Sequence, residues 1–233
     1  MCLRGIHKLD MCKAPEMPGH KGRAEMGETM KAEKGLFPKV KALYEAVEEL
    51  IFENVDVKEI KVSDITSRAG IGKGTAYEYF KNKEEIISSA LLYHIDLICR
   101  QMIKNLKELN DFTQAMEFIL SSIDREIKKR DCLIQFVHLL SDNGLIGKVL
   151  QKKMKEKNKE ICTPRDVLSH MIQVGMDNGD ISREIPAAYA SLAIAAKVIA
   201  YIIYITENGE EEFSRGEMHR MICAGLRREL QSG

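Results

Sequence analysis

The feature that most constrains this chain is a helical period that continues along most of its length. From Phe37 onward, apolar residues recur at three- and four-residue steps, as in Val40, Leu43 and Val47. This spacing places them on one face of an amphipathic helix, whereas a half-buried strand needs strict alternation. No segment shows convincing alternation. We therefore predict an all-α protein.

Residues that start or stop helices refine this pattern. Thr163, Pro164 and Asp166 form a start signal, because the threonine can cap, the proline suits the first turn and the acid suits the third position. Gly70 suits the left-handed turn that ends a helix. Helices are expected near residues 40–51, 62–69, 76–79, 86–102, 111–127, 131–140, 146–157, 163–178, 186–205 and 213–230.

Composition is that of an ordinary globular protein. The chain has 233 residues, of which 45% are hydrophobic and 30% are charged, and its formal net charge is zero. Any contact with nucleic acid must therefore come from the local placement of lysine and arginine. Residues 1–36 lack apolar periodicity, and we expect a flexible tail there. No signal peptide is evident, which favours a cytoplasmic protein.

One segment has the length and the apolar character of a membrane span. Residues 185–205, "IPAAYASLAIAAKVIAYIIYI", carry almost no charge. Much of the segment is alanine, however, and Lys197 near its middle would cost about 2.5–3.5 kcal/mol in a bilayer. A helix that packs against other helices explains the segment better, and we expect no membrane contact.

The cysteines and histidines are scattered. Six cysteines occur without any C-x-x-C pair, and the six histidines are equally dispersed. This distribution favours reduced thiols over a disulfide framework or a metal site. We predict no metal and no cofactor, while a thiol- or metal-responsive regulator stays open as an alternative.

The stretch "AGIGKGTAYEYFKNKEE" (69–85) has two interpretations. Gly72 to Thr75 could cradle the phosphates of a nucleotide, as in a phosphotransferase, or could grip the phosphates of DNA. A phosphate loop needs a strand before it, whereas a helix is expected here. The pattern G-x-x-x-x-G-K-[ST] also fails, because Lys73 is followed by Gly74. We therefore predict that the protein is not an enzyme.

A helix–turn–helix fits these residues instead. Ala69 lets two helices approach, Gly70 makes the turn and Ile71 fills the junction. The longer stretch "VSDITSRAGIGKGTAYEYFKNKEEII" combines a turn glycine with G-T-x-Y and K-x-K-E. In this combination it resembles the DNA-binding signature of the tetracycline-repressor (TetR) family of transcriptional regulators.

The resemblance implies DNA contacts for eight residues. Lys73 and Gly74, at the start of the recognition helix, would face base edges in the major groove. Hydroxyl groups of the same helix would bind phosphates, and lysines or a serine at neighbouring helix starts would add further contacts. The candidates are Lys61, Ser63, Lys73, Gly74, Thr75, Tyr77, Tyr79 and Lys83. For the two tyrosines, core packing is the alternative.

The resemblance also implies three parts and a dimer. Residues 1–36 would be the tail, 37–87 the helix–turn–helix domain, and 88–233 a helical domain for ligand sensing and dimerisation. The last two long helices would pair with their mates in a homodimer. Such a regulator is usually a repressor that a small molecule releases from double-stranded operator DNA.

The effector is expected to be apolar, because methionine and aromatic side chains adapt to apolar ligands. Each candidate taken alone is more often plain core, so no pocket residue is assigned. The side chains that could line a pocket are Tyr93, Met102, Phe112, Met116, Phe136, His138, Met171 and Tyr189.

Overall fold

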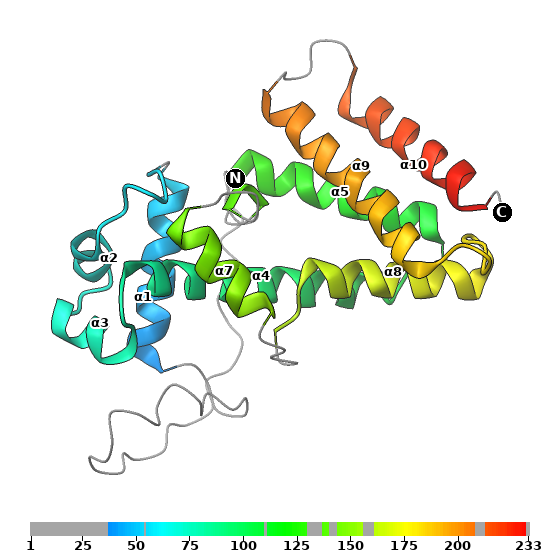
Figure 1. The fold of residues 1–233 in the computed structure, drawn as a ribbon. Coiled ribbons are helices and arrows are strands. Elements are labelled where there is room, and N and C mark those ends of the chain that lie inside the picture. The colour runs from blue at the N-terminus through cyan, green and yellow to red at the C-terminus, as the bar shows by residue number, and fades with distance from the viewer. Residues whose placement is uncertain are drawn as a thin grey trace. The chain divides into compact units, whose positions relative to one another are not determined.

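A computed structural model describes residues 37–53, 55–109, 111–129, 137–139, 144–155, 161–207 and 213–231. The chain separates into two compact units, Met1–Gly35 and Leu36–Gly233, and the described residues all belong to the second. Within them every regular element is a helix, which confirms the all-α prediction (Figure 1). Of the helix expected over 131–140, only 137–139 are described, and these are helical.

The described helices follow the predicted order with small shifts of their ends. Their bounds are α1 Pro38–Phe52, α2 Val62–Arg68, α3 Lys73–Tyr79, α4 Lys83–Leu106, α5 Phe112–Lys129, α7 Leu145–Lys155, α8 Pro164–Asn178, α9 Ala187–Glu207 and α10 Arg215–Gln231.

Several of the predicted end signals act as expected. Thr163 caps α8, where its N–H donates to the Asp166 carboxylate across 2.7 Å, and Pro164 occupies the first turn. The same helix ends at Gly179, whose φ of 79° is left-handed. At α5, the backbone N–H of Gln114 donates to the Asp111 carboxylate across 2.9 Å. These caps satisfy backbone groups that the helices leave without partners.

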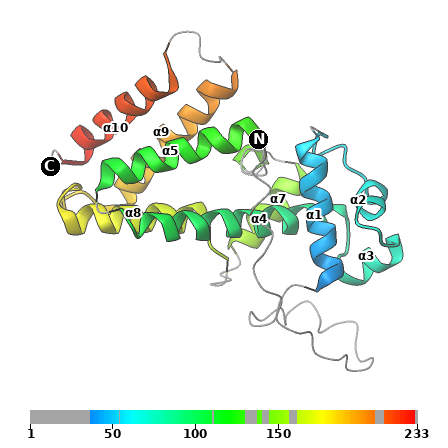
Figure 2. The ribbon, with the colours of Figure 1, turned by 180° about the vertical axis from the view of Figure 1, so that it is seen from behind.

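The first three helices form a small bundle that packs on the start of α4. The predicted stripe of α1 is buried, with Leu43 and Val47 fully covered. Ile65 of α2 and Ala76 of α3 are also fully buried. Figures 1 and 2 show α2 and α3 beside α1, away from α9 and α10.

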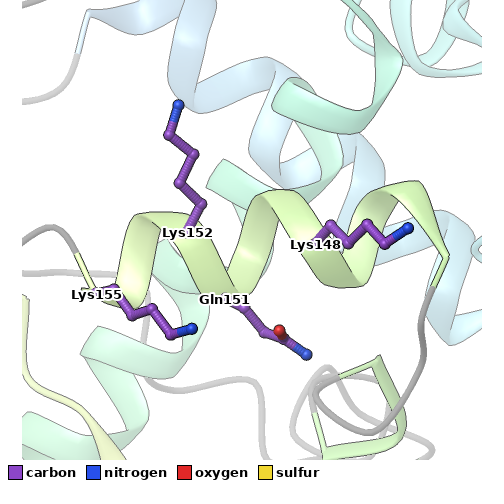
Figure 3. Close-up of a pocket in the computed structure, with 4 residues that line it drawn as sticks. All are labelled: Lys148, Gln151, Lys152 and Lys155. Atoms are coloured by element: carbon purple, nitrogen blue, oxygen red, sulfur yellow. The ribbon is translucent and has the colours of Figure 1, made fainter.

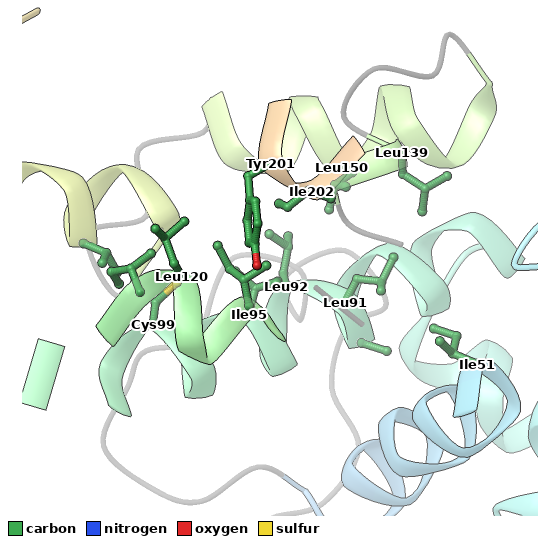
Figure 4. Packing of buried hydrophobic residues seen from close by; sticks show 14 of the residues in the cluster. Ile51, Leu91, Leu92, Ile95, Cys99, Leu120, Leu139, Leu150, Tyr201 and Ile202 are labelled. Atoms are coloured by element: carbon green, nitrogen blue, oxygen red, sulfur yellow. The ribbon is translucent and has the colours of Figure 1, made fainter. Parts of the chain in front are cut away.

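Helix α4 is the central element of the unit. It packs against α1 near its start and against α7 and α8 along its length, while α5 and α9 contact α8 and α10. Figure 4 shows Leu91, Leu92 and Ile95 of α4 beneath Leu150 of α7 and Ile202 of α9. The predicted boundary at residue 87 falls inside α4, so the two proposed domains share this helix.

Among the residues that the structure describes, two helices, α4 and α9, are long and apolar enough to cross a membrane by length and composition. Of the most apolar stretch of 18 residues in α4, 56% is buried inside the protein, whereas 33% of the corresponding stretch in α9 is buried. Lys197 of α9 donates from its Nζ to Glu229 of α10. An ion pair in the middle of α9 fits a helix that packs against protein, and one or two helices of this length and composition are weak evidence for a membrane span.

Candidate nucleic-acid interface

Helix α3 divides its seven residues between the core and solvent. Ala76 is fully buried, whereas Lys73, Gly74 and Glu78 are exposed and Tyr77 is 52% exposed. The exposed positions follow steps of one and four residues, so they share one face of the helix. This face offers an ammonium, a phenol hydroxyl and a carboxylate to an outside partner.

Gly70 in the turn and Gly74 in α3 have different roles. Gly70 has a φ of 66°, a backbone conformation that side-chain-bearing residues rarely adopt, so the turn itself requires a glycine. Gly74 has no such requirement, and a Cβ placed there would meet no atom within 4 Å. Gly74 is the second residue of α3, and alanine favours a helix more than glycine does, so the fold gives no reason for a glycine there. Close approach of an external surface to the helix would explain why a side chain is absent at this position.

Tyr79 and Thr75 are half-buried rather than exposed. The ring of Tyr79 packs on Phe37, with 6.2 Å between ring centroids, and Phe37 precedes the first turn of α1. Packing and DNA contact, the two interpretations of this tyrosine, are therefore compatible, since a packed ring can still present its hydroxyl at the surface. Tyr77 is the more exposed of the two tyrosines.

The three remaining candidates lie at helix starts and make contacts within the chain. The Lys83 Nζ donates to the backbone carbonyl of Lys58 across 2.8 Å, which ties the start of α4 to the loop before α2. The Ser63 hydroxyl donates to the Asp64 carboxylate, and the backbone N–H of Lys61 donates to the same carboxylate. An ammonium has three donors, so Lys83 keeps capacity for a phosphate.

Arg68 has a structural role. Its guanidinium donates two hydrogen bonds to the Glu53 carboxylate, at 2.6 and 2.7 Å, and Glu49 lies 3.7 Å away. This fork joins the end of α2 to the end of α1 and lowers the pKa of Glu53, because the hydrogen bonds favour the ionised carboxylate. The pairing of residues 15 apart leaves no local sequence signal, so sequence reasoning missed it.

A second contact missed from the sequence joins α1 to α4. His94 is buried, its Nε2 lies 3.3 Å from the carbonyl oxygen of Tyr44, and its Nδ1 lies 3.5 Å from Glu48. Tyr44 packs between Phe80 and Tyr93, and burial raises its pKa to about 12. The aromatic cluster therefore joins the middle of α4 to α1.

The thiols described by the structure show no reactive environment. Cys99 of α4 and Cys162 before α8 hydrogen-bond to each other, and burial raises the pKa of both. Burial also raises the pKa of Cys223 to about 11. A thiol is nucleophilic as its thiolate, so raised values oppose reactivity. Among the described residues, no group of three or more His, Cys, Asp or Glu side chains could hold a metal ion.

Comparison with known proteins identifies the helix–turn–helix. Residues 51–90, which span the end of α1, both short helices and the start of α4, match the model of bacterial regulatory proteins of the tetR family. The helix–turn–helix segment is therefore that of the TetR family of transcriptional regulators, in agreement with the resemblance found in the sequence. The matched segment contains all eight sequence-predicted contact residues, whose roles stay predictions.

Proteins that are similar to this chain over most of its length include regulators of fatty acid metabolism. The fatty acid metabolism regulator protein of Bacillus subtilis (strain 168) is 26% identical over 152 residues, which cover 62% of this chain and 71% of that protein. FadR of Bacillus subtilis, solved in complex with stearoyl-CoA, has a TM-score of 0.59 at 20% identity and covers 81% of this chain and 96% of its own. FadR of Bacillus halodurans has a TM-score of 0.61 at 18% identity, covering 83% and 96%.

Proposed function

We propose that this TetR-family transcriptional regulator is a cytoplasmic homodimeric repressor that a long-chain acyl-CoA releases from its operator. The observation that carries the effector class is the relative at 26% identity that is named a regulator of fatty acid metabolism. A structural neighbour crystallised with stearoyl-CoA supports the same class. An acyl chain also agrees with the apolar effector predicted from the sequence.

The DNA contacts of the proposal follow from α3. Lys73 and Gly74 face base edges, because both are exposed at the amino end of the helix. Thr75, Tyr77 and Tyr79 donate to phosphates and fix the register of the helix in the groove. Lys61, Ser63 and Lys83 add contacts at the starts of α2 and α4.

The dimer surface of the proposal is the outer face of α9 and α10. Leu192 is 65% exposed, and Ile199 and Ile203 continue the same face at steps of seven and four residues. Met221 of α10 is also exposed. Contiguous apolar surface of this kind marks protein contact sites, and a second copy offers the same face. Two recognition helices would then meet successive major grooves about 34–36 Å apart.

The mechanism is a shift between two dimer geometries. Helix α4 contacts α1 through the His94 and Tyr44 cluster and contacts α7 and α8 in residues 88–233. Effector bound among these helices would favour a geometry in which the recognition helices no longer match the groove spacing. In this scheme 37–87 form the DNA-binding domain and 88–233 the sensing and dimerisation domain.

Release of DNA by the effector tests the proposal. A fluorescent operator duplex bound to the purified protein is titrated with stearoyl-CoA, and anisotropy reports the bound fraction. We expect stearoyl-CoA to release the duplex and an unrelated apolar compound to leave it bound. Operator binding that no acyl-CoA of any chain length disturbs would refute the effector class and leave the DNA-binding role standing.

A further inference from the structure

The outer face of α7 carries a concentration of positive charge. The helix has the sequence LIGKVLQKKMK, with four lysines and no acid. Lysines in the last turn stabilise a helix through its dipole, which explains Lys152, Lys153 and Lys155. Lys148 lies in the first turn, where a positive charge opposes the dipole.

The inner face of the same helix belongs to the core. Ile146, Gly147 and Leu150 are buried against α4, and Figure 4 shows Leu150 above Leu91. Lys153 lies toward α4, with its Nζ 3.9 Å from Glu85. Helix α7 therefore separates an apolar interior from a cationic exterior across a single helix diameter.

The cationic exterior borders a hollow of about 440 Å³. Its described lining is Lys148, Gln151, Lys152 and Lys155, which we name the α7 lysine face. Figure 3 shows Gln151 and Lys155 extending to the same side of the helix, with Lys152 on the other side in this view. Positions 148, 151 and 155 are three and four residues apart and share one face. Of these three, Lys148 and Lys155 offer ammonium groups, which are hydrogen-bond donors.

We propose that the α7 lysine face binds the phosphates of the acyl-CoA effector. The inference rests on the proposed function, because it takes its ligand class from there. An acyl-CoA joins an apolar chain to a head with several phosphate charges, and the exposed lysines of α7 have the charge that complements this head. Ammonium groups attract phosphate through charge-assisted hydrogen bonds, whereas a free fatty acid carries no phosphate.

Titration calorimetry on the full chain tests the inference with stearoyl-CoA and stearate as separate probes. The variant Lys148→Gln/Lys155→Gln is expected to bind stearoyl-CoA about tenfold more weakly, since two partly exposed ion pairs are lost. Stearate binding is expected to stay unchanged. The variant should also show a shallower dependence of stearoyl-CoA affinity on salt.

Two further variants control for charge and for chemistry. Lys104→Gln/Lys107→Gln removes two exposed lysines at the end of α4 and should leave both affinities unchanged. Lys148→Arg/Lys155→Arg keeps the charge and should retain stearoyl-CoA affinity. Thermal unfolding of each variant verifies that the fold is intact, as expected for exposed residues.

The possible outcomes distinguish failure of this inference from failure of the proposed function on which it rests. If Lys148→Gln/Lys155→Gln binds stearoyl-CoA as tightly as the wild type, the lysine face is solvated surface only, and the effector class stands. The same holds if both double-glutamine variants weaken binding equally. If the wild-type protein binds no stearoyl-CoA, the effector class and the inference fall together, while operator binding is measured separately.

Discussion

Helices α3 and α9 both present side chains that their own chain leaves uncovered, and the two faces have opposite chemistry. The face of α3 carries Lys73, Gly74 and Tyr77, whereas that of α9 carries Leu192 and Ile199. Hydrogen-bond donors in a short helix suit the grooves and phosphates of DNA. Broad apolar area suits another protein surface. Under the proposed function, one chain therefore forms two interfaces that bind their partners by different physical means.

The two interfaces also differ in how they tolerate change. Groove recognition depends on a few donors and one close approach, so single substitutions in α3 should alter which sequence is bound. A dimer face depends on the sum of its buried apolar area. Disrupting the dimer should therefore need the introduction of a charged side chain rather than the truncation of one apolar side chain. Variants of the two helices therefore test the assignment of each face.

The largest effect is expected from charges on α9. Leu192→Glu/Ile199→Glu should convert the dimer to a monomer and weaken operator binding by about a hundredfold or more, because two half-sites no longer bind together. Sedimentation velocity measures the first effect and duplex anisotropy the second. The monomer should keep its helical content, since both side chains are exposed.

A matched control places the same charges elsewhere. Gln101→Glu/Gln114→Glu alters exposed positions of α4 and α5 and should leave mass and affinity as in the wild type. Persistence of the dimer in Leu192→Glu/Ile199→Glu would move the dimer surface away from α9.

A smaller effect, about tenfold in DNA affinity, is expected from single lysines. Lys83→Ala should weaken binding to all duplexes alike with a shallower salt dependence, because the residue is assigned to phosphate. Lys73→Ala should also change which bases are preferred. Binding to a panel of operator variants at several salt concentrations separates the two. Identical behaviour of both variants would contradict the assignment of Lys73 to base edges.

A pair of glycine substitutions should separate folding from recognition. Gly70→Ala forces a side chain into a left-handed backbone and should cost about 1–2 kcal/mol of unfolding free energy. Gly74→Ala should leave stability equal or up to about 1 kcal/mol higher, while weakening DNA binding. Urea unfolding and duplex anisotropy measure the two quantities. Full DNA affinity in Gly74→Ala would remove the proposed close approach.

The smallest effect concerns the ion pair between α9 and α10. The Lys197 ammonium lowers the pKa of Glu229 from its ordinary 4.5, and Tyr189 donates a second hydrogen bond. A lowered folded pKa stabilises the protein above the unfolded pKa, and this contribution is lost as pH falls below about 4.5. Glu229→Gln should therefore lower Tm by about 1–3 °C at pH 7, and the difference should shrink toward pH 3.5.

The control for that pair removes a carboxylate from the exposed loop before α9. Glu184→Gln should leave Tm unchanged across the same pH range. A Tm difference for Glu229→Gln that stays constant with pH would show that the carboxylate charge is not what stabilises the pair.

The sequence predicted those features whose cause is local. Helical period located the described helices, and the Thr163 and Gly179 signals fixed both ends of α8, because caps act within one turn. The turn at Gly70 was equally predictable from its neighbours. The helix–turn–helix could be assigned because groove binding demands particular residue types at fixed spacing.

Features that depend on distant pairing were not predictable. The Arg68 fork to Glu53 and the His94 contact with Tyr44 join residues 15 and 50 apart, and no pattern in either segment indicates its partner. Of the pocket candidates, Tyr189 and His138 are exposed and Phe136 lies outside the described residues. Apolar type alone cannot distinguish a lining from a core or an outer face.

Selection of duplexes from random DNA by the full protein tests the central claim most directly. The account predicts enriched sequences that form an inverted repeat, with half-site centres about 10 bp or a multiple of that apart, protected by two copies of the chain. Enrichment of no sequence, or of a single half-site bound by one copy, would contradict it.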